Sequence, residues 1–116
     1  MQTAKSPAVE PQAVKPEAAP LSDATLAAIQ RLYGNAQQTI KAIEWLAEEG
    51  FEPHSIHVGR SAKPLICIEG CSLCMRLKRV YGAYLYMMRP GPKGRETVWR
   101  ACIYGCLVEW TEVSHA

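Results

Sequence analysis

Two cysteines three residues apart, Cys71 and Cys74, have the types and spacing most suited to chemistry. They follow Gly70 and open a stretch whose apolar residues recur with helical spacing. Two thiolates on one turn can provide half of a structural zinc site. The same pair at a helix N-terminus, which lowers a thiol pKa, can act as a redox dithiol. The pair therefore predicts a small structural-zinc or dithiol protein as one alternative function.

A complete zinc site needs a second pair of ligands, and the sequence offers no well-spaced one. Cys102 and Cys106 fall on an expected strand and turn, where their side chains point differently. No spacing brings His54 or His57 to a particular cysteine. The candidate ligands are Cys67, Cys71, Cys74, Cys102, Cys106, His54, His57 and His115. We expect these thiols to be small packing groups and expect no cofactor, with zinc as the alternative.

Other catalytic arrangements are missing from the sequence. There is no glycine-rich phosphate loop and no paired-carboxylate motif, and no cysteine–histidine dyad is indicated. The acidic residues Glu48, Glu49 and Glu52 fit the solvated end of a helix. We therefore predict that the protein is not an enzyme.

Basic residues are concentrated in one block of a chain whose net charge is only +2. Residues 1–59 carry four Lys or Arg against seven Asp or Glu, which is a balance of −3. Residues 60–100 carry nine against two, which is +7, and residues 101–116 return to −2. Such a block is an argument about partners rather than about fold.

We predict that six of these residues form a basic binding face: Arg76, Lys78, Arg79, Arg89, Lys93 and Arg95. The expected partner is an acidic surface on a host protein. Nucleic acid is the alternative, because cations neutralise phosphates and neighbouring aromatic rings stack on unpaired bases. Those rings are Tyr81, Tyr84, Tyr86 and Trp99.

The elements that must position these residues follow from the order of patterns. Four prolines among Ala, Lys and Glu predict a disordered tail over residues 1–21, followed by a single domain over 22–116. Residues 22–49 predict a helix that begins at Ser22 or Asp23 and ends at Gly50. Its apolar stripe is Leu26, Ile29, Tyr33, Ala36, Ile40, Ile43 and Ala47. This stripe packs on the protein's own sheet or, alternatively, pairs two copies in a homodimer.

The remaining segments predict strands and one short helix. Residues 54–69 read as a β-hairpin, and residues 71–81 as the basic helix. Strands at 83–88, 96–104 and 107–113 form an antiparallel meander, with a loop at 89–95. A turn at Gly105-Cys106 sets Ala101 opposite Trp110. The predicted fold class is α+β, with order α-β-β-α-β-β-β and a mainly antiparallel sheet.

Three segments resemble small open reading frames of bacteriophages and prophages. They are Lys41-Ala42-Ile43-Glu44-Trp45-Leu46 through Phe51, Ile56-His57-Val58, and Gly105-Cys106-Leu107-Val108-Glu109-Trp110. The resemblance implies an accessory protein of a mobile element that occupies a surface on a host protein, as an inhibitor or modulator. The chain has no run near the roughly 20 apolar residues of a membrane helix and no signal-peptide pattern. We expect it in the bacterial or host-cell cytoplasm, with reduced cysteines.

Overall fold

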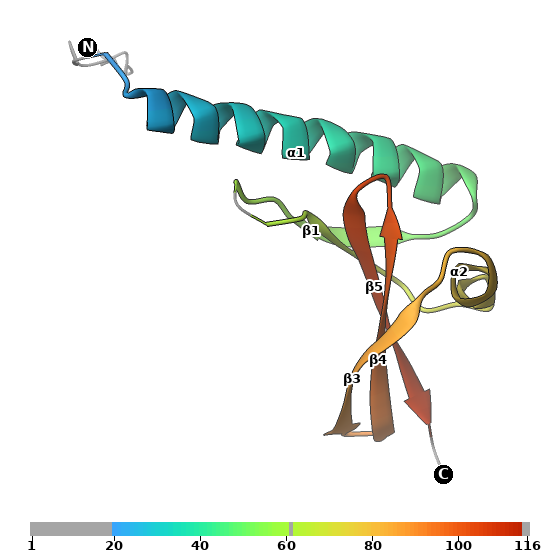
Figure 1. Ribbon diagram of the computed structural model, residues 1–116. Coiled ribbons are helices and arrows are strands. Elements are labelled where there is room, and N and C mark those ends of the chain that lie inside the picture. The colour runs from blue at the N-terminus through green and yellow to red at the C-terminus, as the bar shows by residue number, and fades with distance from the viewer. Residues whose placement is uncertain (1–19, 61, 115–116) are drawn as a thin grey trace, which may run out of the picture.

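The computed structural model describes residues 20–60 and 62–114, and it confirms the α+β class (Figure 1). The predicted tail lies outside the described residues except for Pro20 and Leu21, which are exposed. The elements are α1 (Asp23–Glu48), β1 (Pro53–His57), β2 (Leu65–Ile68), α2 (Cys74–Val80), β3 (Tyr84–Gly91), β4 (Gly94–Ile103) and β5 (Cys106–Ser114).

Helix α1 begins and ends where its capping residues predict. The Ser22 side chain accepts a hydrogen bond of 3.1 Å from the backbone N–H of Thr25, which satisfies one free donor of the first turn. At the other end, Gly50 takes φ +97°, a left-handed conformation that costs glycine little. The helix runs unbroken through Gly34 over 26 residues.

The five strands form one mixed sheet in the order β1-β2-β5-β4-β3. Neighbouring strands pair antiparallel except for β2 and β5, which pair in parallel from Leu65 opposite Leu107 to Cys67 opposite Glu109. The predicted hairpin and meander are therefore joined edge to edge through β5. The sequence indicated the two parts but not the parallel pair that joins them.

Both helices pack on one face of this sheet. The core between them combines α1 residues Ala42 and Leu46 with α2 residues Cys74 and Leu77. The other core residues are Phe51, Ile66, Ile68, Ala101, Ile103, Cys106, Val108 and Trp110. Burial of these apolar side chains provides the main driving force for folding. None of the described helices covers the opposite face of the sheet (Figure 1).

The buried face of α1 differs from the predicted stripe. The residues buried on α1 are Ala28, Thr39, Ala42 and Leu46. At 100° per residue, their centre lies about 110° around the helix from the centre of the predicted stripe. In that stripe, Leu26, Ile29, Tyr33 and Ile40 are exposed, and only Ile43 packs against the core. Small residues face the sheet because they let the helix backbone approach it closely.

The β4–β5 turn is shifted by one residue from its predicted position. Tyr104 at φ +49° and Gly105 at φ +76° are the two central residues, so the closing pair is Ile103 opposite Cys106. As a result, Ala101 lies opposite Val108 rather than Trp110. The register is wrong by two residues, which leaves every side chain on its predicted face because strands have a period of two.

The predicted loop at 89–95 is also wrong, because the β3–β4 ladder continues through most of it. Arg89 pairs with Glu96, Pro90 with Arg95 and Gly91 with Gly94. Pro90 is tolerated because β3 is an edge strand, where a missing N–H breaks no ladder on its outer side. The result is a long β3–β4 hairpin that extends away from α1 and is flanked by β5 as far as Arg95 opposite Ser114 (Figure 1). This hairpin is called the β3–β4 arm below.

Candidate protein-binding surface

Strand β3 carries the most concentrated set of exposed apolar side chains on the sheet. Five consecutive residues, 84–88, are each 40–50% exposed, and they are Tyr84, Leu85, Tyr86, Met87 and Met88. β3 is the edge strand next to β4, so its outer backbone groups have no neighbouring strand among the described residues. Tyrosine, methionine and arginine are enriched in protein interfaces, and this strand offers all three.

The two faces of β3 differ in what lies beside them. Leu85 pairs with Trp99 and Met88 with Thr97, on the same face as the helices. Tyr84 pairs with Arg100 on the open face, and the register shifts between Leu85 and Met87. Such a bulge leaves an additional residue on one strand and bends the edge. Tyr86 is the additional residue, because Leu85 pairs with Trp99 and Met87 with Val98. Tyr86 and Met87 therefore both lie on the open face of the sheet, next to Arg100 and Val98.

Cations already cover two of the aromatic rings in this part of the sheet. The Arg100 guanidinium carbon lies 3.6 Å from the centre of the Tyr86 ring, and Arg100 also donates to Glu109 at 2.9 Å. Lys78 Nζ lies 4.0 Å from the centre of the Trp99 ring. Each cation is attracted by the electron-rich ring face. One face of each ring is thus occupied, which reduces the surface that a nucleic acid base could stack on.

The six predicted basic residues fall in two groups on separate elements. Arg76, Lys78 and Arg79 belong to α2, and Arg89, Lys93 and Arg95 surround the tip of the β3–β4 arm. In α2, Arg76 pairs with Glu49 at 2.7 Å, and this hydrogen bond raises the pKa of Arg76. Lys78 pairs with Glu112 at 3.0 Å. Only Arg79 in this group has no ion pair within the described part of the chain.

The tip of the β3–β4 arm keeps its basic residues at the surface. Arg89 is half exposed and pairs with Glu96 at 2.8 Å, while Lys93 and Arg95 are exposed. An open hollow of about 710 Å³ lies at this tip, lined by Met88, Arg89, Pro90, Gly91, Gly94 and Arg95. Apolar atoms and guanidinium groups therefore share one concave surface.

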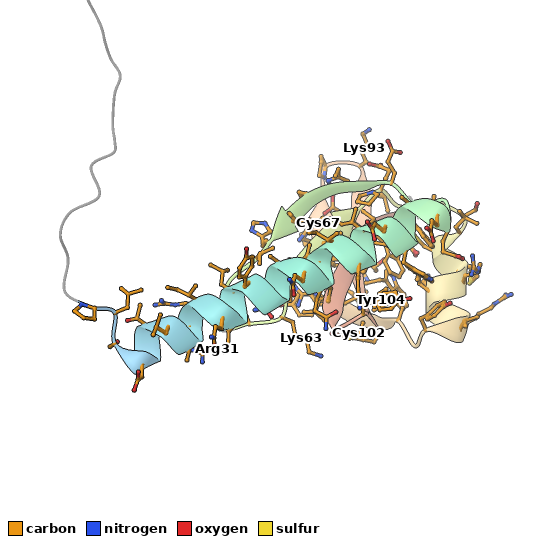
Figure 2. The ribbon with its side chains drawn as sticks, turned by 90° about the horizontal axis from the view of Figure 1, so that it is seen from above. Arg31, Lys63, Cys67, Lys93, Cys102 and Tyr104 are labelled. Carbon is orange, nitrogen blue, oxygen red and sulfur yellow. The ribbon has the colours of Figure 1, made fainter. Side chains whose placement is uncertain are left out.

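The structure contains a third group of basic residues that the sequence analysis did not predict as a site. Arg31, Arg60 and Lys63 line a hollow of about 630 Å³ together with Asn35 and Gln38. Figure 2 shows Arg31 and Lys63 on the same side of α1. The segment that follows β1 is held against α1 by Asn35, whose side chain donates a hydrogen bond of 2.7 Å to the Gly59 carbonyl. Because Arg31 is 29 residues from Arg60 in sequence, no local pattern signalled this group.

The two members of the cysteine pair lie close together and differ in exposure. Cys71 is exposed and Cys74 is buried in the core. Burial raises the pKa of the Cys74 thiol to about 11, with smaller contributions from the adjacent Cys71. This shift keeps the buried Cys74 thiol protonated at neutral pH, so Cys74 is a packing group of the core in that state.

The other candidate metal ligands are dispersed. Cys102 is exposed on β4, and Cys106 is buried beneath α1, where its thiol is hydrogen-bonded to Thr39. Burial raises the pKa of Cys106 despite that bond. His54 and Cys67 line a hollow of about 230 Å³, His57 is exposed on β1, and His115 lies outside the described residues. Within residues 20–60 and 62–114, no three His, Cys, Asp or Glu side chains gather as a metal site.

Comparisons with protein-family models, with curated proteins and with solved structures find no match to this chain. Among the described residues, no helix combines the length and apolar character needed to cross a membrane.

Proposed function

We propose that this protein is a non-enzymatic binding protein whose β3–β4 arm engages an acidic surface of a host protein. The observation that carries the proposal is the row of five exposed apolar side chains on β3, which leads directly into the basic tip. Hot spots in protein interfaces are rich in Tyr and Arg and combine apolar contact with charge. By occupying this surface, the protein would inhibit or modulate a host process.

The charge of the arm defines the kind of partner. Arg89, Lys93 and Arg95 outnumber Glu96 at the tip, which leaves a local balance of +2. A complementary partner presents carboxylates next to an apolar segment, and an extended segment could also pair with the free edge of β3. All five cysteines are unpaired, which fits action in a reducing cytoplasm.

The test begins with a pull-down from nuclease-treated bacterial lysate and continues with calorimetry on the purified partner. We expect Tyr86→Ala, Met88→Ala and Arg95→Glu each to weaken binding by tenfold or more. Arg79→Glu on α2 is the matched control and should change affinity less than threefold. Equal losses from Arg79→Glu and Arg95→Glu would contradict the assignment to the arm.

Nucleic acid binding predicts a different result. Fluorescence anisotropy with a single-stranded oligonucleotide would show affinity that falls steeply with salt, and the pull-down partner would be lost on nuclease treatment. We expect neither, because Arg100 and Lys78 already occupy aromatic faces. Tight, salt-sensitive oligonucleotide binding that is lost in Arg95→Glu would overturn the proposal.

A further inference from the structure

Much of the predicted apolar stripe of α1 is exposed to solvent. Tyr33 is 70% exposed, Ile40 is 57% exposed, and Leu26 and Ile29 are each 45% exposed. These residues share one side of the helix, about 135° from the side that packs on the sheet. Contiguous apolar patches of this kind on a soluble protein mark an interaction site.

The side of α1 with this stripe lacks charge along much of its length. Between residues 24 and 40 the only charged residue is Arg31. At 100° per residue, Arg31 lies about 170° around the helix from the centre of the stripe. An uncharged surface offers nothing to attract a charged partner, and it raises no repulsion against an identical surface.

The stripe is also nearly palindromic about Ala36. Reading outward from Ala36 in the two directions gives Tyr33 and Ile40, then Ile29 and Ile43, then Leu26 and Ala47. In an antiparallel pair of helices related by a two-fold axis, those residues face each other. The small Ala36 would face itself at the axis and permit close approach. Self-complementarity of this type is what a two-fold symmetric interface requires.

We propose that the occupant of the stripe is a second copy of this chain, paired through antiparallel α1 helices that cross at Ala36. The N-terminal half of each α1, which extends past its own sheet in Figures 1 and 2, would then cover the C-terminal half of α1 in the other copy. Ile56 on edge strand β1 is half exposed and pairs with Ile66, on the face of the sheet that the helices cover.

The available area is sufficient for a dimer of moderate affinity. Helices of 26 residues give a contact of about 39 Å. Leu26, Ile29, Leu32, Tyr33 and Ile40 expose roughly 500 Å² of side chain per copy, because 41–70% of each is exposed. Flanking polar side chains bring the total for both copies to about 1,200 Å², the lower end for stable interfaces.

Sedimentation equilibrium on the full chain over roughly 1–100 μM tests the proposal. The expected mass at high concentration is twice 12.8 kDa. Tyr33→Asp and Ile40→Asp should each give a monomer at 50 μM with an unchanged circular dichroism spectrum, because both side chains are exposed. Gln38→Asp, on the opposite side of α1, is the matched control and should remain dimeric.

Cross-linking tests the antiparallel arrangement, in a chain with exposed Cys71 and Cys102 changed to serine. Ala36→Cys should form an intermolecular disulfide with diamide as oxidant, and Gln38→Cys should not. A mixture of Leu26→Cys and Ala47→Cys chains should cross-link, whereas Leu26→Cys alone should not. A monomeric wild-type chain, a dimer that survives both aspartate variants, or self-cross-linking of Leu26→Cys would overturn the proposal.

Discussion

The two halves of α1 are similar in apolar content and opposite in environment. The C-terminal half places Thr39, Ala42 and Leu46 against the sheet, where each is buried. The N-terminal half leaves its large apolar side chains, including Leu26 and Tyr33, exposed. The difference arises from the reach of the sheet rather than from the helix pattern. Apolar periodicity indicates a helix face that can be buried, and only the tertiary structure shows which part of that face the protein's own sheet covers.

Two leucines provide the strongest test of this comparison. Leu46→Ala opens a cavity in the core and should lower the free energy of unfolding by about 2–5 kcal/mol. Leu26→Ala, measured by urea denaturation at a concentration where the chain is monomeric, should cost less than about 1 kcal/mol. Equal losses would show that the N-terminal half is packed within the single chain after all.

Raising the pH should lower the free energy of unfolding by a smaller amount, through the buried thiol of Cys74. Burial raises the pKa of the Cys74 thiol in the folded state to about 11 from its ordinary value of 9.0. Between about pH 9 and 11 the thiol is therefore ionised in the unfolded chain and still protonated in the folded one. The contribution of this thiol to the free energy of unfolding is fully present below about pH 8 and is lost as pH rises toward 11. The loss is on the order of 2 kcal/mol.

Because tyrosines and lysines titrate in the same range, the informative quantity is a difference between variants. Denaturation midpoints from pH 7 to 10.5 should fall less steeply for Cys74→Ala than for the wild type. Cys102→Ala, which removes an exposed thiol, should follow the wild type. If Cys74→Ala kept the wild-type slope, burial of this thiol would not be the cause.

Gly34 within α1 and Gly50 just past its C-terminal end should give the smallest effects, with opposite signs. A methyl group on Gly34 meets nothing within 4 Å, so Gly34→Ala should stabilise the helix by about 0.5–1 kcal/mol. Gly50 has φ +97°, and a methyl group there would lie 3.0 Å from Leu73 Cδ1, so Gly50→Ala should destabilise by about 1 kcal/mol. Thermal denaturation distinguishes the two; a loss in Gly34→Ala would indicate a hidden contact on the exposed half.

Local chemistry made much of the fold predictable. Ser22 and Gly50 set the helix ends, and alternation assigned the correct faces to β4 and β5. The turn between them was misplaced because Tyr104 adopts a positive φ, which non-glycine residues rarely do. The loop prediction at 89–95 is wrong because proline normally interrupts a strand, whereas the edge strand β3 tolerates Pro90. Each error came from a position where tertiary context overrides a residue's usual preference.

The site was less predictable than the fold because charge alone does not show pairing. The sequence predicts one basic face that includes Arg76, Lys78 and Arg95. In the structure, Arg76 forms a salt bridge with Glu49 and Lys78 forms one with Glu112, and both partners are distant in sequence. The apolar row on β3 was visible as a strand, but its position at the sheet edge depends on β5 pairing with β2. That pairing joins residues more than 40 positions apart and leaves no local signature.

The central position of β5 has a consequence for synthesis of the chain on the ribosome. β5 comes last among the described strands, yet it is the only link between the β1–β2 and β3–β4 hairpins. Until residue 114 has left the exit tunnel, the nascent chain holds two separate hairpins and an undocked helix, each with apolar side chains in water. The native sheet therefore forms only after β5 has emerged, and chaperones would have their longest access just before this strand emerges.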